Sequence, residues 1–351
     1  MGERHKLCIC GHFAFGENKL NGQTIKTKVI TDALEQKLGE HSIIKIDTCG
    51  GVKSLFRLPL ALAKALRSCD NLVILPAYKG VRVITFILSF LRLFYHGCKV
   101  HYVVIGGWLP KYVRTKFLLK RCLKASVDTI YCETTTMIRQ LAQSGIDNTV
   151  LMPNCKELTP ITPGSLHLER HEPFRLCTFS RVMQQKGMEE AVRAVEKINV
   201  EHGREVFTLD IYGPVWPTEQ EWFAHLQESF PPSVHYKGTV PFDAAVEVLK
   251  DYFLLLFPTL FYTEGVPGTI IDAYAAGLPV LASRWESFSD VIDDGQTGIG
   301  YEFGSFEALY GSLEDIALHS DRIEGMRLQC IDKYQQFRPG HVVEGLVEHL
   351  Q

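Results

Sequence analysis

Short apolar runs, separated by longer segments of mixed polarity, recur along the whole chain and limit the folds open to it. Each run has the length and continuous apolar character of a strand that is buried on both faces of a sheet. The segments between the runs are long enough for helices, and a helix is expected over residues 24–38, where Val29 and Ala33 share an apolar face. Strands are expected at 6–13, 42–47, 71–76, 99–106, 128–133, 175–179, 207–212, 234–238, 252–257 and 280–283. This alternation predicts an α/β fold of mostly parallel sheets, each covered by helices on both faces.

A proline-rich stretch interrupts the alternation near the middle of the chain. Residues 155–173 hold three prolines and little periodicity, which is typical of a linker. The 351 residues are also too many for one ordinary core and suit two domains. We therefore expect an N-terminal Rossmann-like domain over 1–160, a C-terminal one over 161–330, and a helix over 331–351 that crosses back toward either domain.

The two halves carry opposite charge. Residues 1–165 hold 23 Lys and Arg against 11 Asp and Glu, a net charge of +12, whereas the remainder holds 14 against 29, or −15. This asymmetry indicates that the first half faces an anionic partner. The N-terminal sequence MGERHKLCIC enters a strand without the pattern of a signal peptide, and the ten cysteines show no CxxC pair or metal-ligand spacing. A cytoplasmic protein with reduced cysteines is the expectation.

The sequence TEGVPGTIIDAYAAGLPVLAS (263–283) places a helix start directly after an expected strand. Pro267 suits the first helical turn, where the N–H groups of Gly268 and Thr269 have no intrahelical acceptor. Such a terminus at the carboxyl end of a parallel strand attracts an anion, most often a phosphate.

Acids and bases gather around this helix start. Glu264 and Asp272 would repel a phosphate, but carboxylates are good acceptors for sugar hydroxyls. Arg181 and Lys186 follow another expected strand and suit a diphosphate. A nucleoside-diphosphate sugar satisfies both groups, because its phosphates lie between hydroxyl-bearing ends. Alternatively, the acids lie near a helix N-terminus without binding a ligand, because the helix dipole favours negative side chains there. The alternative for the cations is a pair of ordinary surface charges.

Four motifs of the second half resemble the retaining glycosyltransferases of family 4, of the type that builds capsular polysaccharides and exopolysaccharides. They are EGVPGTIIDAYAAGLPVLAS (264–283), SRVMQQKG (180–187), IYGPV (211–215) and YKGTVP (236–241). The resemblance implies the GT-B fold, in which two Rossmann-like domains face each other across a cleft. It also implies transfer from a nucleotide sugar, with a UDP-sugar favoured, and no metal or other cofactor.

The resemblance further implies roles for single residues. Glu264 contacts the donor sugar, Asp272 contacts the ribose, and Arg181 and Lys186 neutralise the diphosphate. The donor site is also expected to include Gly213, Gly238, Gly265, Pro267, Gly268 and Thr269.

The chain departs from the family pattern at two places. Asp272 stands where the family usually has Glu, and Gly106 and Gly107 stand where many relatives have a histidine near the sugar.

The segment NGQTIKT (21–27) is the part of the first half that shares the resemblance. Gly22 would let the backbone approach the donor phosphates, with Gln23 and Lys26 close by. A flexible loop followed by a helix cap is the alternative. The segment lacks GxGxxG, which counts against a dinucleotide oxidoreductase.

Residues 111–124 form a basic segment that contains six Lys and Arg and no acid. At helical spacing Val113 and Phe117 share one stripe, while Leu119 and Leu123 share another. A basic amphipathic helix suits an anionic membrane surface, here the inner face of the membrane, although a solvated basic face over an ordinary core stripe explains the pattern too.

The function expected is therefore transfer of a sugar from a nucleotide-diphosphate sugar to a glycan or lipid-linked glycan. Two alternatives stay open. A catalytically degenerate GT-B subunit that stabilises a partner transferase would fit the Asp272 departure, and a nucleotide-sugar epimerase would share the fold but need its own acid/base set. No nucleic-acid partner is expected.

Overall fold

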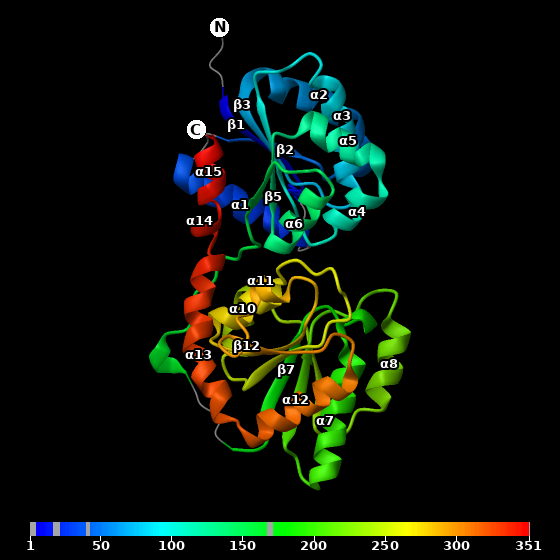
Figure 1. Cartoon of the computed structure of the whole chain (residues 1–351), viewed down its shortest axis with the longest axis vertical. Helices are drawn as coiled ribbons and strands as arrows, with labels where there is room; N and C mark the ends of the chain where they lie inside the picture. Colours follow the sequence, from blue (N-terminus) through cyan, green and yellow to red (C-terminus); the bar gives the residue numbers. More distant parts are fainter. Residues whose placement is uncertain (1–4, 17–21, 40–42, 167–170, 351) are drawn as a thin grey trace. The chain divides into compact units, whose positions relative to one another are not determined.

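The computed structural model describes residues 5–16, 22–39, 43–166 and 171–350. These residues form two compact units, Met1–Glu157 with Phe337–Gln351, and Leu158–Gln336 (Figure 1). Each unit contains a six-stranded sheet whose strands are all parallel. The expected fold class, two Rossmann-like α/β domains, is confirmed.

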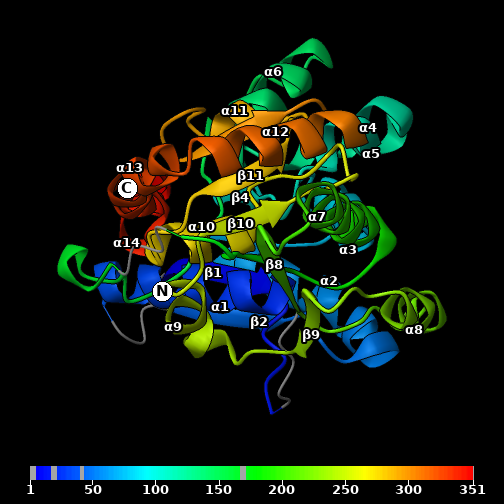
Figure 2. The same cartoon turned by 90° about the horizontal axis from the view of Figure 1, so that it is seen from below.

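The first unit has the strand order β2-β1-β3-β4-β5-β6. Its strands are β1 (His5–Gly11), β2 (Ile43–Asp47), β3 (Cys69–Ile74), β4 (Lys99–Val103), β5 (Thr129–Cys132) and β6 (Thr149–Leu151). Its helices are α1 (Gly22–Leu38), α2 (Gly51–Ser68), α3 (Gly80–Leu91), α4 (Leu109–Thr115), α5 (Phe117–Ser126), α6 (Thr135–Gln143), α14 (Pro339–Val342) and α15 (Glu344–Leu350). Buried residues of α2, α3, α5 and α6 form one core, and those of α1, α14 and α15 form another. Figures 1 and 2 show α3 and α5 side by side.

The second unit has the strand order β12-β11-β10-β7-β8-β9. Its strands are β7 (Phe174–Phe179), β8 (Phe207–Tyr212), β9 (Val234–Gly238), β10 (Leu254–Phe257), β11 (Val280–Ser283) and β12 (Gly298–Tyr301). Its helices are α7 (Met188–His202), α8 (Gln220–Glu228), α9 (Ala245–Leu249), α10 (Gly268–Ala275), α11 (Phe288–Val291), α12 (Phe306–Leu318) and α13 (Asp321–Tyr334). The helix α7 packs against α12, and α10 packs against α9 and α13.

Several elements differ from the sequence expectation. The strands β6 and β12 were not expected, because β6 has only three residues and β12 begins with the sequence GIG, which favours a turn. The basic segment 111–124 is divided between α4 and α5, since Lys116 between them has the non-helical angles φ −124° and ψ 85°. The expected C-terminal helix is divided too: α13 belongs to the second unit, whereas α14 and α15 belong to the first.

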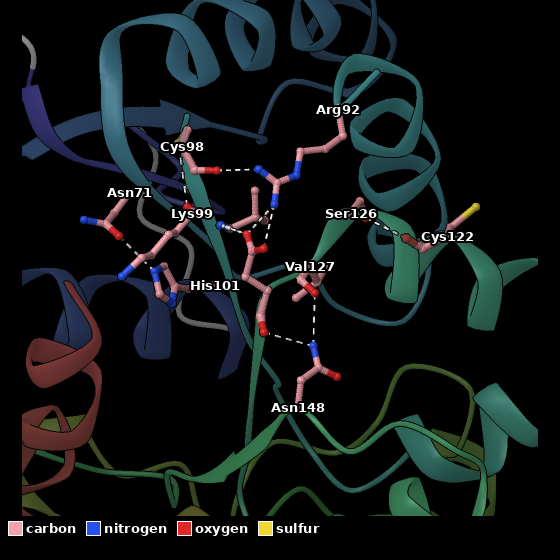
Figure 3. A network of polar contacts seen from close by, with 11 residues as sticks. Asn71, Arg92, Cys98, Lys99, His101, Cys122, Ser126, Val127 and Asn148 are labelled. Carbon is pink, nitrogen blue, oxygen red and sulfur yellow. Dashed lines mark hydrogen bonds and ion pairs between the residues drawn. The ribbon is translucent and has the colours of Figure 1, made fainter. Parts of the chain in front are cut away.

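A polar network joins the amino ends of β4, β5 and β6 in the first sheet (Figure 3). Arg92 donates to both carboxylate oxygens of Asp128 at 2.6 Å and to the carbonyl oxygen of Cys98 at 2.6 Å. The side-chain amide of Asn148 donates to the carbonyl oxygens of Val127 and Asp128 at 3.0 Å. These polar groups bond one another, so this edge of the sheet has a structural role.

A second chain of polar contacts ties the C-terminal helix α15 to the same sheet. The Nε2 atom of His101 donates to the side-chain oxygen of Asn71 at 3.0 Å, and its Nδ1 atom lies 3.2 Å from the Tyr131 hydroxyl. The Tyr131 hydroxyl in turn lies 3.0 Å from Nδ1 of His349 in α15. His101 is buried, and this burial lowers its pKa to about 4. The neutral imidazole is therefore the form that the folded unit holds.

Candidate functional site

The strand order places a topological switch point in the middle of the second sheet. From β7 the chain continues to β8 and β9 on one side, then returns to β10 on the other side of β7. The loops after β7 and β10 therefore diverge at the carboxyl edge of the sheet, which is where ligands bind in open α/β folds. The loop after β7 carries Arg181 and Lys186, and the loop after β10 carries Glu264.

An ion pair joins the two loops. The Lys186 ammonium bonds the Glu264 carboxylate, and the two side chains are 14% and 16% exposed. The ammonium also lies 5.4 Å from the centre of the Phe257 ring. The pair is therefore sheltered but within reach of solvent, so a ligand can contact both of its members.

The backbones of the two loops are held together as well. The Leu260 N–H donates to the carbonyl oxygen of Gln185 at 2.9 Å. Gly187 has φ 70°, and a Cβ there would lie 2.0 Å from the carbonyl oxygen of Pro258, so no other residue fits. Because both loops are fixed in this way, the positions of Lys186 and Glu264 are fixed relative to each other.

Arg181 lies on the exposed side of the same loop. Its guanidinium carbon is 5.0 Å from the centre of the Trp216 ring, which orients the side chain by a cation–π contact. The neighbouring Ser180 packs directly on Gly213, where a Cβ would lie 1.9 Å from the Ser180 carbonyl oxygen. This close contact is a packing reason for the glycine at position 213.

Gly238 and Gly213 are bonded to each other rather than directed outward. The Gly213 N–H donates to the carbonyl oxygen of Gly238 at 2.8 Å, and the Tyr236 hydroxyl donates to the Gly213 carbonyl oxygen at 2.9 Å. These bonds join the ends of β8 and β9 beside the Arg181 loop. In this structure the two glycines position that loop, and their contact with a donor stays a prediction.

The helix α10 begins at Gly268, directly after Pro267, as the sequence predicts within one residue. Gly265 and Pro267 are buried and fix the approach to the helix. The Thr269 hydroxyl is shielded from solvent and has no hydrogen-bond partner within the described part of the chain. An orphaned hydroxyl in the first turn, beside N–H groups that lack intrahelical acceptors, is an arrangement that a phosphate would satisfy.

Asp272 lies one turn into α10 and is only 2% exposed. The sequence places it correctly on the helix that follows Glu264, but does not predict this degree of burial. Its expected contact with a ribose stays a prediction.

The first sheet has a switch point of its own, between β1 and β3. A pocket of about 540 Å³ lies there, lined by residues that follow β1, β2 and β3 and by Gln23 of α1. Gln23 donates to the carbonyl oxygen of Leu75 at 3.1 Å, and Gly22, the first residue of α1, is exposed. Both lie in the first unit, whereas the other expected site residues except Lys26 lie in the second.

His12 in this pocket is a residue that the sequence reasoning missed. It directly follows β1 and its Nδ1 lies 2.7 Å from the Thr24 hydroxyl. The family resemblance implies a histidine near Gly106, where this sequence has none. The available signal was a histidine immediately after the first strand. Asp47 fixes the loop beyond His12, since its carboxylate accepts from the N–H groups of Phe13 at 2.9 Å and Phe15 at 3.0 Å. Burial alone would raise the pKa of Asp47, but these and other backbone donors lower it overall.

Lys26 has a different position from the one expected. It is 3% exposed and its ammonium bonds the Glu133 carboxylate at 2.5 Å and the carbonyl oxygen of Val104 at 2.9 Å. Glu133 also accepts from the Gly106 N–H at 2.9 Å. In this structure Lys26 is therefore not available to a donor phosphate. Together with Glu133 it stabilises the loop after β4, which contains Val104 and Gly106.

Comparison with known proteins identifies relatives of the segment that carries these loops. Residues 173–318 match the family model described as glycosyl transferases group 1, so this segment, from β7 to α12, is related to that family. The D-inositol 3-phosphate glycosyltransferase of Nocardia farcinica is 26% identical over 242 residues, which cover 64% of this chain and 52% of the relative. The amylovoran biosynthesis glycosyltransferase AmsK of Erwinia amylovora is 25% identical over 147 residues, 41% of this chain and 36% of the relative. The chain thus matches about half or less of either relative's length.

A solved structure shares the fold over nearly the whole chain. Anabaena Alr3699/HepE, determined in complex with UDP, superposes with a TM-score of 0.76 at 14% identity and covers 98% of this chain and 99% of its own. At this identity the likeness establishes the fold, which is that of the GT-B glycosyltransferases. None of the helices that the described residues form is long and apolar enough to cross a membrane.

Proposed function

We propose that the chain is a retaining glycosyltransferase that moves a sugar from a UDP-sugar to a glycan or lipid-linked glycan without a metal ion. The observation that carries the proposal is the Lys186–Glu264 ion pair, on loops at the switch point of the segment related to glycosyl transferases group 1. The loop of Lys186 also carries Arg181. The complex of Alr3699/HepE with UDP supports UDP as the first nucleotide to test.

The geometry suits a reaction in which the diphosphate is the leaving group and also accepts the proton of the acceptor hydroxyl. Lys186 and Arg181 would neutralise the diphosphate as the sugar–phosphate bond breaks, and the start of α10 with Thr269 would bind its oxygens. Removing one such donor typically costs about 2.7–4 kcal/mol of transition-state stabilisation. In front-face transfer the leaving phosphate takes the proton of the acceptor hydroxyl, so neither a protein nucleophile nor a metal ion is required. Glu264 would accept a hydrogen bond from a sugar hydroxyl and orient the donor.

Two measurements test this proposal. A thermal-shift panel of nucleotide sugars should identify the donor, since a ligand at about 100 times its Kd adds about 2.7 kcal/mol of stability. The donor that binds should then be turned over to UDP slowly in water and faster with an acceptor, and NMR of the product should show the anomeric configuration of the donor. An inverted product would contradict the retaining assignment. Nucleotide binding without any UDP release would favour the degenerate subunit, and conversion of the free nucleotide sugar would favour the epimerase.

We also propose that the first unit works at an anionic membrane surface. The apolar side chains Phe86 and Phe90 of α3 and Phe117 and Leu118 of α5 are 60–71% exposed, and the helices α4 and α5 carry several Lys and Arg and no acid. Exposed aromatic residues among cations are typical of surfaces that bind the lipid headgroup region. The division of the basic segment into two helices does not remove this pattern.

Cosedimentation with vesicles tests the membrane proposal. The protein should bind vesicles that contain anionic lipid and not neutral ones, and raised salt should release it, because each cation near the surface adds about 1 kcal/mol. Replacing Lys116, Lys120 and Lys124 together by Gln should abolish vesicle binding and leave UDP affinity unchanged. Binding to neither lipid, or equal binding to both, would reject membrane association without affecting the transferase assignment.

A further inference from the structure

A groove of about 920 Å³ lies on the first unit between α3 and the pair α4 and α5. Ile87, Leu119 and Cys122 form its inner surface, and Phe86, Phe117 and Leu118 line it nearer to solvent. Its volume is at the upper end of the roughly 300–1,000 Å³ of small-molecule sites. The apolar part of this groove favours a hydrocarbon chain, because a polar group placed against it would lose its hydrogen bonds to water.

The charged residues of the groove all have one sign. Lys79, Arg82 and Lys116 line it, and none of its described lining residues is Asp or Glu. An apolar ligand with an anionic group matches this arrangement, whereas a neutral hydrocarbon would form no ion pair with the three cations.

The groove adjoins the pocket at the switch point of the first sheet. Tyr78, Lys79 and Val83 line both the groove and the pocket of about 540 Å³ that holds His12 and Gln23. A ligand that extends from the groove into the pocket would therefore contact an apolar surface first, then the Lys79 ammonium, and then the hydrogen-bonding side chains of the pocket.

We propose that the groove binds the hydrocarbon chain of a lipid-linked acceptor, with its phosphate at Lys79 and its sugar in the pocket around His12. The order of chemistry in such a molecule, chain, phosphate and sugar, is the order of the surfaces just described. This proposal rests on the proposed transferase function, because it assigns the acceptor of that reaction. It is narrower than membrane association, since it requires one chain to enter one groove.

Dodecyl phosphate, kept below its micellar concentration, is a suitable probe for isothermal titration calorimetry. We expect saturable binding of one molecule per chain, no measurable binding of inorganic phosphate, and binding of dodecyl maltoside at least about tenfold weaker. Across octyl, decyl and dodecyl phosphate the affinity should rise by up to about fourfold per methylene group.

Matched variants locate the binding. Phe86→Asp and Phe117→Asp change side chains that are 61% and 71% exposed, so the fold should be retained, and each should lower dodecyl phosphate affinity at least about tenfold. Phe56→Asp is the control, because Phe56 on α2 is 78% exposed but does not line the groove, and it should bind as the wild type does. Lys79→Gln should weaken dodecyl phosphate and leave dodecyl maltoside unchanged.

The outcomes separate this proposal from the transferase assignment. An equal loss in Phe56→Asp, or no loss in Phe86→Asp and Phe117→Asp, would show general adsorption and overturn the groove assignment. So would a dimer in solution that Phe86→Asp dissociates, since the groove would then hold a second copy. Release of UDP from a UDP-sugar by a protein that fails to bind dodecyl phosphate rejects the groove assignment alone. Specific binding of dodecyl phosphate without UDP release rejects the transferase and with it the acceptor role, and leaves a binding site for a lipid phosphate.

Discussion

Each unit contains a lysine–carboxylate pair close to the carboxyl edge of its sheet, and the two pairs differ in burial. Lys26 and Glu133 in the first unit are each 3% exposed, while Lys186 and Glu264 in the second are 14% and 16% exposed. The Lys26–Glu133 pair is also bonded to the backbone of the loop after β4, through Val104 and Gly106. The Lys186–Glu264 pair is supported by loops whose own backbones are bonded to each other.

This difference decides what each pair can do. Two charges that are removed from water and fixed by backbone bonds cannot exchange partners without a large desolvation penalty, so the Lys26 pair is a structural element. A pair that solvent still reaches can admit a phosphate to the ammonium and a hydroxyl to the carboxylate. The same residue types therefore serve the fold in one unit and, as we propose, the reaction in the other.

The largest expected effect comes from breaking the buried pair. Lys26→Met should lower the free energy of unfolding of the first unit by about 3–5 kcal/mol, because it leaves the Glu133 carboxylate buried without this ammonium. Urea unfolding followed by circular dichroism measures the change. The double variant Lys26→Met with Glu133→Gln should recover much of the loss. A stable Lys26→Met protein with weakened UDP affinity would restore the donor-binding role for Lys26.

Breaking the accessible pair should instead affect turnover. Lys186→Ala and Arg181→Ala should each lower turnover by about two to three orders of magnitude, because the leaving diphosphate loses one fixed cation. The free energy of unfolding should fall by at most about 2 kcal/mol, since Glu264 stays within reach of solvent. UDP release and thermal unfolding on the same preparations give both numbers. Near-normal turnover in either variant would exclude that side chain from the diphosphate site.

The fold could be predicted from the sequence because its strands are continuous apolar runs, such as 252–257 before α10. The helix starts were also predictable where a proline or glycine marks them, as at Gly268. The short strand β6 and the glycine-containing β12 lack this pattern, and pairing with a neighbouring strand stabilises them instead. The helix break at Lys116 could not be predicted, because no proline or glycine marks it in the sequence.

The site was predictable only in part, because spacing does not specify burial. The motif around Lys186 and Glu264 correctly indicated that the two residues lie on loops of the same sheet edge. Lys26 is at a plausible spacing as well, but tertiary packing places it under the loop after β4. His12 was missed because a single histidine after a strand carries no motif.

His101 extends the comparison of buried charges between the two units, because it is a buried group of the first unit that can take up a proton. Its pKa of about 4 in the folded unit is below the ordinary value of 6.5, so the unfolded chain binds the proton more readily between these values. The stabilisation that comes from keeping His101 neutral should be complete above pH 6.5. It should be lost as the pH decreases toward 4, which lowers the free energy of unfolding by on the order of 3 kcal/mol. Urea unfolding at several pH values measures this, and His101→Gln, which cannot titrate, should show a weaker dependence. An unchanged pH dependence in that variant would assign the loss to other groups.

The two carboxylates of the second unit should be separable by ligand. Glu264→Gln should weaken the intact nucleotide sugar by about 1.5–3 kcal/mol and leave UDP nearly unchanged, because UDP lacks the donor sugar. Asp272→Asn should weaken both ligands, because both contain the ribose. Calorimetry with UDP and the UDP-sugar on each variant tests this. Parallel losses for both ligands in both variants would remove the distinction, and the 2% exposure of Asp272 would then indicate a role in the fold of α10.

Glycine replacement gives the smallest expected effect and tests the first unit's share of the donor site. Among the residues that the structure describes, none outside the adjacent backbone lies within 4 Å of a Cβ built on Gly22, and Gly22 already begins the helix α1. Gly22→Ala should therefore stabilise the unit by about 0.4–1 kcal/mol, a rise in Tm of about 2 °C, because it reduces the freedom of the unfolded chain. If the backbone at Gly22 approaches the donor phosphates, as the sequence predicts, the same change should weaken UDP-sugar binding several-fold while stability rises. Thermal unfolding and calorimetry on this one variant separate the two effects. Unchanged affinity would leave the donor site to the second unit, with its Lys186–Glu264 pair as the centre.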